Sequence, residues 1–320
     1  MNKLAVITGF LGTVRNRYML YQEDRPLEAK FALASRVDGL DGLELCYPAD
    51  FADVPLLKSL LDDHGYGVSA INFRSRRTGQ WLRGSFTSAD AHERQATVDD
   101  CRRAVDYAAD LGCNRITTCT LNEGHDYPFE ADYRDLYRHA EETFAAVCEH
   151  NPRVRICIEY KWNDPRARAL LAGAGETLAF CQAVGAENLG VTLDIGHALY
   201  GGERPAQSAA LLARAGKLFY VHLNDNDRAW DWDMIPGAYH VWDFVEFFYY
   251  LQELGYTDDW YAYDVFAKEH DTAETMTASL AITRKLEGLA ARVDRATMAE
   301  LLIARNPARS LQYLYSLLIE

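Results

Sequence analysis

The feature that most constrains the fold is a regular alternation of short apolar segments with longer segments of helical periodicity. Runs rich in β-branched and aromatic residues, bounded by glycine or polar clusters, predict buried strands. Eight such runs occur, at 4–10, 42–47, 67–73, 115–121, 154–161, 189–197, 218–225 and 260–266. Helical patterns follow them at 27–36, 54–64, 90–111, 133–150, 176–183, 206–215, 241–254 and 273–290. Gly112, Gly185, Gly216 and Gly255 stand where four of these helices should end, as C-terminal capping favours.

Eight successive strand–helix units within 320 residues predict the α/β class and a single (β/α)8 TIM barrel. A doubly wound sheet would also alternate, but it would seldom place polar residues at the ends of so many strands. Two further helical patterns, 296–304 and 307–319, follow the eighth unit. We therefore expect a barrel catalytic domain over 1–294 and a short C-terminal helical extension over 295–320. The last helix is apolar enough to pack under the barrel or against a second subunit; we favour a homo-oligomer, a dimer or a tetramer.

Side chains that bind metals stand at the ends of the last four predicted strands. These are Glu159, Asp194, His222 and Asp264. A buried carboxylate or imidazole is costly unless it is paired or bound to a metal. The carboxyl ends of barrel strands meet on one face. The four residues therefore predict a divalent-metal site at the mouth of the barrel. The alternative is that each residue is an unrelated cap or salt-bridge partner. This alternative is weaker because such residues occur at the ends of four successive strands.

A second group of polar residues lies close to the first in the sequence. His197 follows Asp194 by three positions, and Asp231 and Asp233 flank a tryptophan, so that both carboxylates can face one ion in an extended loop. A solvated acidic loop is the alternative. Lys161 lies two positions after Glu159 and points to the same side of the strand. It can donate to a substrate oxygen, or serve as a counter-ion to Glu159.

Three of these motifs resemble one family. Glu159-Tyr160-Lys161-Trp162-Asn163-Asp164-Pro165-Arg166 resembles the strand-five motif of the xylose isomerase-like TIM-barrel superfamily of sugar isomerases and epimerases. Asp194-x-x-His197 resembles the strand-six pair of its aldose–ketose isomerases, and Asp231-x-Asp233 resembles their acidic pair after strand seven. The choice of aspartate on strand six and histidine on strand seven is most similar to that of the L-rhamnose isomerase type of enzyme. The resemblance extends over 4–290.

The resemblance implies a metal-dependent intramolecular oxidoreductase that interconverts an unphosphorylated aldose and its ketose by a hydride shift. It implies a structural ion held by the four strand-end residues and a second ion held by His197, Asp231 and Asp233, with Glu159 between the two. The implied catalytic residues are Lys161, Glu159, His197 and Asp233. The implied cofactor is Mn²⁺ or Mg²⁺, with Co²⁺ or Zn²⁺ as alternatives, at one or two ions per chain.

The sequence departs from the family pattern where the sugar should bind. Trp162 replaces the usual proline, and no histidine near the second or third strand matches the residue that opens the sugar ring. His125, after the fourth strand, is a possible substitute. The aromatic residues Trp162, Phe73 and Trp81 are candidates for the wall that faces the sugar, with core packing as the alternative.

Other functions stay open on the same barrel. A ketose 3-epimerase uses two long carboxylates on strands five and eight, where this chain has the shorter Asp264. A sugar lyase or dehydratase that uses one metal ion is a second alternative on this fold. A non-catalytic sugar-binding subunit with the same fold is a third. An abasic-site endonuclease, or any nucleic-acid partner, is disfavoured by the net charge of −14.

Seven cysteines without a C-x-x-C pair suggest buried free thiols of a cytoplasmic protein. No apolar run approaches the ~20 residues of a membrane span, and the N-terminus lacks a signal-peptide layout, so no membrane partner is expected. The expected partner is a small-molecule sugar.

Overall fold

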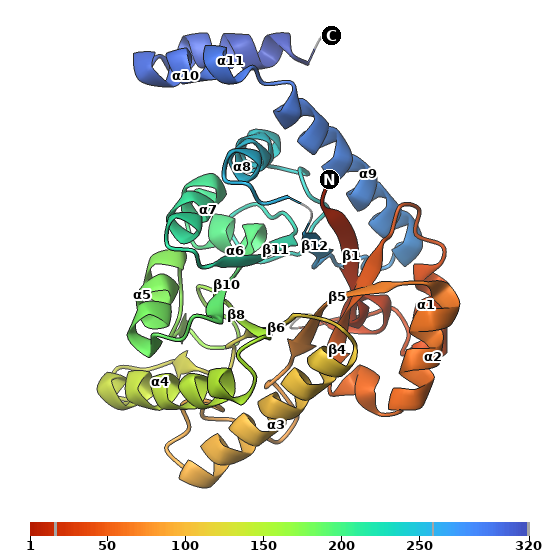
Figure 1. Cartoon of the computed structure of the whole chain (residues 1–320), viewed down its shortest axis with the longest axis vertical. Coiled ribbons are helices and arrows are strands. Elements are labelled where there is room, and N and C mark those ends of the chain that lie inside the picture. Colours follow the sequence, from red (N-terminus) through yellow and green to blue (C-terminus); the bar gives the residue numbers. More distant parts are fainter. Residues whose placement is uncertain (16–17, 258, 319–320) are drawn as a thin grey trace.

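A closed barrel of eight parallel strands forms the centre of the computed structural model, which describes residues 1–15, 18–257 and 259–318 (Figure 1). Around the barrel the order is β1 (Lys3–Ile7), β4 (Gly42–Tyr47), β5 (Gly67–Phe73), β6 (Arg115–Cys119), β8 (Arg155–Glu159), β10 (Leu189–Asp194), β11 (Leu218–Leu223) and β12 (Trp260–Tyr263), which pairs again with β1. Every neighbouring pair is parallel. The predicted (β/α)8 barrel is confirmed.

Helices surround the barrel; they connect successive strands, except for the last, which follows β12 (Figure 1). They are α1 (Leu27–Ala34), α2 (Val54–His64), α3 (Ala91–Asp110), α4 (Tyr133–His150), α5 (Ala174–Val184), α7 (Pro205–Arg214), α8 (Val241–Glu253) and α9 (Thr272–Ala291). Asp53, Asp90, Asp132 and Asp271 each cap the start of a helix by accepting a backbone N–H. Gly185 ends α5 at a φ of +74°, as its position in the sequence predicted.

Short elements fill the loops that follow the barrel strands. They are η1 (Thr8–Leu11), the pair β2 (Val14–Arg15) and β3 (Leu20–Tyr21), η2 (Ala49–Phe51), and the pair β7 (Gly124–His125) and β9 (Arg168–Ala169). These loops lie at the carboxyl ends of the strands, the face that bears the site in barrels of this kind.

One predicted strand boundary is wrong in a way that matters for the site. The pattern extended the sixth strand to residue 197, whereas β10 ends at Asp194 and the helix α6 (Ile195–Tyr200) begins at once. The side chain of Asp194 caps this helix, because its Oδ1 accepts the backbone N–H of His197 at 2.8 Å. The apolar run continues through α6 because the helix is buried as completely as the strand.

A partly buried ion pair lies at the amino end of the barrel. Arg115, at the start of β6, donates from Nη2 to Asp259 Oδ1 and from Nη1 to the carbonyl oxygen of Phe219 at 3.1 Å. Higher in the barrel, the hydroxyls of Thr117 and Thr192 lie 2.7 Å apart. The interior is therefore filled with side chains, and a substrate must approach from the carboxyl end.

Two helices extend beyond the barrel at the end of α9, α10 (Arg295–Ala304) and α11 (Pro307–Ser316) (Figure 1). A small separate core of Val293, Met298 and Leu301 holds them to each other and to Tyr249 of α8. No residue of α11 is buried. Residue 319 of the expected last helix lies outside the described residues. None of the described helices is long and apolar enough to cross a membrane.

Candidate active site

The four strand-end residues of the predicted metal site meet at the carboxyl end of the barrel. Glu159 ends β8, Asp194 ends β10, His222 lies near the end of β11, and Asp264 follows β12. Their candidate ligand atoms all lie within 4.8 Å of one another. Glu159, Asp194 and His222 are buried, whereas Asp264 is partly exposed. The structure thus brings together four residues of which the first and the last are 105 positions apart in the sequence.

The imidazole of His222 is fixed by carboxylates on both ring nitrogens. Its Nε2 lies 2.9 Å from Glu44 Oε2, while Nδ1 lies 3.2 Å from Glu159 Oε1 and 3.9 Å from Asp194 Oδ2. A proton on Nε2, donated to Glu44, leaves the lone pair of Nδ1 pointing at the other carboxylates. A histidine that binds a metal generally donates its second N–H to such a carboxylate.

The sequence prediction missed Glu44. Its other carboxylate oxygen accepts a hydrogen bond from Asn72 Nδ2 at 2.7 Å, and the side chain has no exposed surface. The signal was present, because Glu44 is a lone carboxylate in the fully buried run of β4. The same reasoning had singled out Asp264 at the eighth strand.

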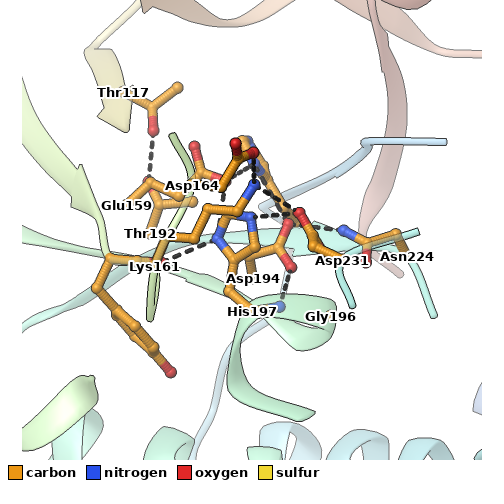
Figure 2. Close-up of polar contacts among 12 residues, drawn as sticks. Thr117, Glu159, Lys161, Asp164, Thr192, Asp194, Gly196, His197, Asn224 and Asp231 are labelled. Atoms are coloured by element: carbon orange, nitrogen blue, oxygen red, sulfur yellow. Dashed lines mark hydrogen bonds and ion pairs between the residues drawn. The ribbon is translucent and has the colours of Figure 1, made fainter. Parts of the chain in front are cut away.

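Asp194 is held on both oxygens by residues that follow strands. Oδ1 accepts the backbone N–H of His197, and Oδ2 accepts Asn224 Nδ2 at 2.8 Å (Figure 2). Gly196 allows this arrangement, since a Cβ there would come within 1.7 Å of Asn224 Oδ1. The carboxylate is therefore positioned before any ligand arrives.

The four residues fit a divalent cation. Three hard carboxylate donors and one imidazole form a mixed ligand set of the kind that Mn²⁺, Mg²⁺ and Co²⁺ accept. Asp264 Oδ1 is buried and has no hydrogen-bond partner among the described residues. Burial, and then the negative charges of Glu159 and Asp194, raise the pKa of Asp264 to about 8. A bound cation would oppose that rise, because it favours the ionised form of each carboxylate.

The second predicted ion site is arranged differently from the expectation. Lys161 Nζ lies 2.7 Å from Asp231 Oδ2 and 3.2 Å from Asp164 Oδ2, and His197 Nε2 lies 3.3 Å from the same Asp231 oxygen (Figure 2). The Lys161 ammonium therefore neutralises Asp231, whereas the alternative considered from the sequence was that it serves as a counter-ion to Glu159. Burial disfavours the charge of Lys161, but Asp231 and Asp164 outweigh it and raise the pKa of the amine well above its usual value.

His197 and Asp233 do not complete a compact second set of ligands. Over the described residues, the other group with ligand atoms within 4.8 Å of one another is Cys119, Glu159 and His197. His197 Nδ1 lies 2.9 Å from the carbonyl oxygen of Tyr160, which leaves Nε2 toward Asp231. Burial, together with the charges of Asp231 and Asp264, raises the pKa of Asp233 well above its usual value.

The predicted wall of aromatic residues is only partly at the surface of the mouth. Phe73 was expected to face the sugar, but it has no exposed surface and packs 6.0 Å from the rings of Tyr47 and Phe86. That expectation is wrong, because the side chain of Phe73 belongs to the core. Trp162 is 39% exposed and lies beneath the Arg168 guanidinium, 4.4 Å from it.

Trp81 and His125 lie in loops at the carboxyl end. Trp81 is buried, has a φ of +53° and lies 4.9 Å from the Arg77 guanidinium. His125, in β7, contacts the ring of Tyr133 at 5.0 Å and has a buried Nδ1 without a hydrogen-bond partner among the described residues. Trp162, Trp81 and His125 stay predicted substrate contacts.

Arg74 is a second residue that the sequence prediction passed over. It follows β5, and a Cβ on Gly9 would come within 2.6 Å of its Nη2. Cys46 first, and then Asp264 and Glu44, raise the pKa of the guanidinium against the effect of burial. Within the described part of the chain its side chain makes no hydrogen bond or ion pair. Its donors are therefore available to a ligand in the mouth.

The fold and this ligand set define a TIM barrel with a candidate metal site at its carboxyl end, and comparison with known proteins gives the family. Residues 31–286 match the family described as xylose isomerase-like TIM barrel, and the chain belongs to that family. The chain is 28% identical over 254 residues to an L-ribulose 3-epimerase from Mesorhizobium japonicum, which covers 79% of this chain and 80% of the relative.

Solved structures of low sequence identity share the fold. An L-ribulose 3-epimerase matches with a TM-score of 0.70 at 22% identity, covering 94% of this chain and 98% of the other. A D-tagatose 3-epimerase-like protein matches with a TM-score of 0.70 at 19% identity, over 90% and 98% of the two chains. A 3-keto-D-glucoside 4-epimerase from E. coli matches with a TM-score of 0.69 at 14% identity, over 89% and 100%.

Proposed function

We propose that this protein is a divalent-metal-dependent epimerase that inverts the configuration at C3 of a ketose. The observation that carries the proposal is the ion pair of Lys161 with Asp231, because it puts an ammonium where a two-metal isomerase would need a second ion. Of the two groups of candidate ligands among the described residues, the group of Glu159, Asp194, His222 and Asp264 is the one that joins carboxylates from the ends of β8 and β12. The epimerase names of the relatives support the same choice. Aldose–ketose isomerisation, which the sequence motifs favoured, becomes the second candidate.

The ligand set suits the chemistry of a carbon next to a carbonyl. A divalent ion held by Glu159, Asp194, His222 and Asp264 would supply Lewis-acid polarisation of the carbonyl and thereby acidify the neighbouring C–H. One of the two carboxylates Glu159 and Asp264 takes the C3 proton, and the electron pair moves toward the carbonyl oxygen as an enediolate forms. The other, in its acid form, returns a proton to the opposite face, so that no proton is gained or lost overall.

Other residues of the mouth position the reactants. Lys161, held by Asp231 and Asp164, can donate a hydrogen bond to a substrate oxygen. Arg74, close to Asp264, offers free donors on the other side of the mouth. Asp264 is one methylene shorter than a glutamate, so its reach requires the substrate carbon to lie near β12.

Exchange with solvent tests the proposal directly. The metal-loaded protein is incubated in D₂O with ketoses of four to six carbons, and the products are examined by NMR. An epimerase that passes a proton through carboxylic acids should place deuterium at C3 and leave the carbonyl in position, because such protons exchange quickly with water. Chelation should abolish the reaction, and divalent ion should restore it. An aldose product with little deuterium at C1 or C2 would overturn the proposal.

The isomerase keeps one observation in its favour, namely that Lys161 is a buried cation aimed at the mouth. If it polarises the carbonyl for a hydride shift, Lys161→Met should lower kcat by about 10²-fold, the size expected for one lost donor to a developing oxyanion. The D₂O experiment then decides whether the affected reaction is isomerisation or epimerisation.

A further inference from the structure

A pocket rich in arginine lies in the loops at the carboxyl end of the barrel, outside the ligand set described above. It has a volume of about 230 Å³ and is lined by Arg76, Arg77, Gln80, Trp81, Leu82, Asn122, Pro165 and Arg166. Three guanidinium groups and no carboxylate form its wall. The chain as a whole has 47 acidic and 33 basic residues, so this local excess of positive charge runs against the overall composition.

The carboxylates around the pocket neutralise only part of this charge. Arg77 binds Asp100, but Asp100 also accepts from Arg103 Nη2 at 2.6 Å, so two guanidinium groups share one carboxylate. Arg166 Nη1 lies 3.2 Å from Asp126. Arg76 forms no ion pair with any residue that the structure describes. The pocket therefore keeps a net positive charge.

Two of the three arginines, Arg77 and Arg166, are also positioned before a ligand arrives. Arg77 donates from Nε to the carbonyl oxygen of Arg74 at 3.1 Å and lies 4.9 Å from the Trp81 ring. Arg166 donates to the carbonyl oxygens of Leu82 and Asn122. Side chains that are already ordered lose less entropy when they bind, which favours a ligand-binding role.

The loop after β8 places the pocket beside the candidate active site. Pro165 and Arg166 directly follow Asp164, which accepts a hydrogen bond from Lys161 Nζ at 3.2 Å. Arg76 lines the same pocket as Pro165 and Arg166, so the pocket adjoins the loop that carries Asp164.

We infer that the substrate is a ketose that carries an anionic group, a phosphate or a carboxylate, at the end of its chain far from the reacting carbon. This inference rests on the proposed function. Guanidinium groups match phosphate and carboxylate oxygens with paired hydrogen bonds, and such charge-assisted bonds are stronger than those of neutral groups. A neutral sugar would leave the positive pocket without a partner. A protein of net charge −14 needs such a local site in order to attract an anion.

The experiment compares three ketoses of equal length with the metal-loaded full chain: a neutral ketose, its terminal phosphate, and the analogue with a terminal carboxylate. One anionic ketose should have a kcat/KM at least about tenfold above that of the neutral one, the value of a single charge-assisted hydrogen bond. The better of the two identifies the anion. Added NaCl should raise KM for the anionic ketose in particular, because salt screens exposed charges.

Two variants locate the effect. Arg76→Gln should raise KM for the anionic ketose about tenfold with little change in kcat, because it removes a distant binding contact. Arg83→Gln removes the same charge from the same loop, at an exposed residue that does not line the pocket, and should change neither constant. Equal effects of the two variants, or a preference for the neutral ketose, would overturn the inference and leave the proposed function standing.

A failure of the proposed function would look different. In that case none of the three ketoses would be epimerised, yet the pocket could still be tested by titration calorimetry with inorganic phosphate and with acetate. Binding of either that weakens in Arg76→Gln and persists in Arg83→Gln would support an anion site. Absence of binding to both would overturn it.

Discussion

At the scale of single residues, the site depends on a chain of contacts that runs from Glu44 through His222 to Glu159. Glu44 orients the imidazole from outside the ligand set, at 2.9 Å from Nε2. A buried carboxylate in this position both selects the tautomer and makes Nδ1 a better donor to a cation. Residues of this kind matter for ligand affinity although they do not touch the ligand.

Glu44→Gln tests that role. The amide keeps the volume but loses the negative charge, so we expect the Kd for Mn²⁺ to rise by about 10- to 100-fold. Calorimetric titration of Mn²⁺ into protein that has been stripped of metal measures this Kd. Glu203→Gln is the control, since Glu203 also accepts from buried hydroxyls, those of Tyr160 and Ser208, but lies outside the ligand set. A similar loss of affinity in both variants would show a general loss of structure instead.

The carboxylate cluster also predicts how pH affects the protein without its ion. The pKa of Asp264 in the folded chain is about 8, above its unfolded value of about 3.9, so stability falls as pH rises between these values. For His197, burial disfavours the charge, but Asp194 and Asp231 raise the pKa to about 10. The stability that protonated His197 contributes to the folded state is fully present below about pH 6.5 and is lost as pH rises toward 10.

Both shifts lower the stability as pH rises between about pH 6.5 and 8, and the shift of His197 continues to lower it toward pH 10. We therefore expect the Tm of the chelated protein to fall across this range, and Mn²⁺ to raise the Tm more at pH 9 than at pH 6. Thermal unfolding with chelator and with ion measures the difference. Asp264→Asn should weaken the pH dependence of the chelated protein. A Tm that rises with pH under chelation would contradict the assignment.

At the scale of elements, the turn from β10 into α6 decides how Asp194 is held. The backbone of α6 caps one oxygen of this residue, and Asn224, after β11, binds the other. The two elements approach closely at Gly196, whose carbonyl oxygen also accepts from Asn226 Nδ2 at 2.8 Å. There is no room for a side chain between them.

Gly196→Ala should therefore damage the site and the fold together. The added methyl group would displace Asn224 from Asp194, and overpacking of this kind costs about 1–3 kcal/mol of unfolding free energy. Urea unfolding and metal titration measure both effects. Gly288→Ala, inside α9, is the control, because a Cβ there meets no atom within 4 Å and should stabilise the helix by about 0.5–1 kcal/mol. Unchanged metal affinity in Gly196→Ala would contradict this account.

At the scale of the whole molecule, the C-terminal helices leave an apolar surface exposed. Leu302, Ile303, Leu311 and Tyr315 lie on α10 and α11, and Ile303 is 83% exposed. These helices project from the barrel (Figure 1) and contact α8, where Arg295 Nε lies 2.7 Å from Glu253 Oε1 and Trp242 Nε1 donates to the Tyr315 hydroxyl at 3.3 Å. An exposed patch of this kind commonly marks an interface, and we expect it to join two copies of the chain.

Ile303→Asp should shift the protein toward monomer, because a charge at the centre of an apolar interface is costly to bury. Sedimentation velocity at several concentrations measures the change. Leu211→Asp on α7, at a residue 43% exposed, is the control and should leave the assembly as it is. A wild-type protein that sediments as a monomer at high concentration would contradict the interface.

Much of this molecule follows from local sequence patterns. The eight strands, the helices around them and the glycines that end helices were predictable, because burial periodicity and backbone conformation are local properties. The convergence of Glu159, Asp194, His222 and Asp264 was also predictable. Each is a polar residue at the end of an apolar run, and parallel strands in a barrel must bring such ends to one face.

The partner of each polar side chain, in contrast, depended on the tertiary structure. Lys161 could have neutralised Glu159, two positions away, but the closed barrel brings Asp231 to it from 70 positions away, and electrostatic pairing follows distance in space. Glu44 and Arg74 come from early strands and reach the site only through barrel closure. Phe73 looked like a wall of the mouth, yet Tyr47 and Phe86 cover it, because packing in three dimensions decides which aromatic rings meet solvent.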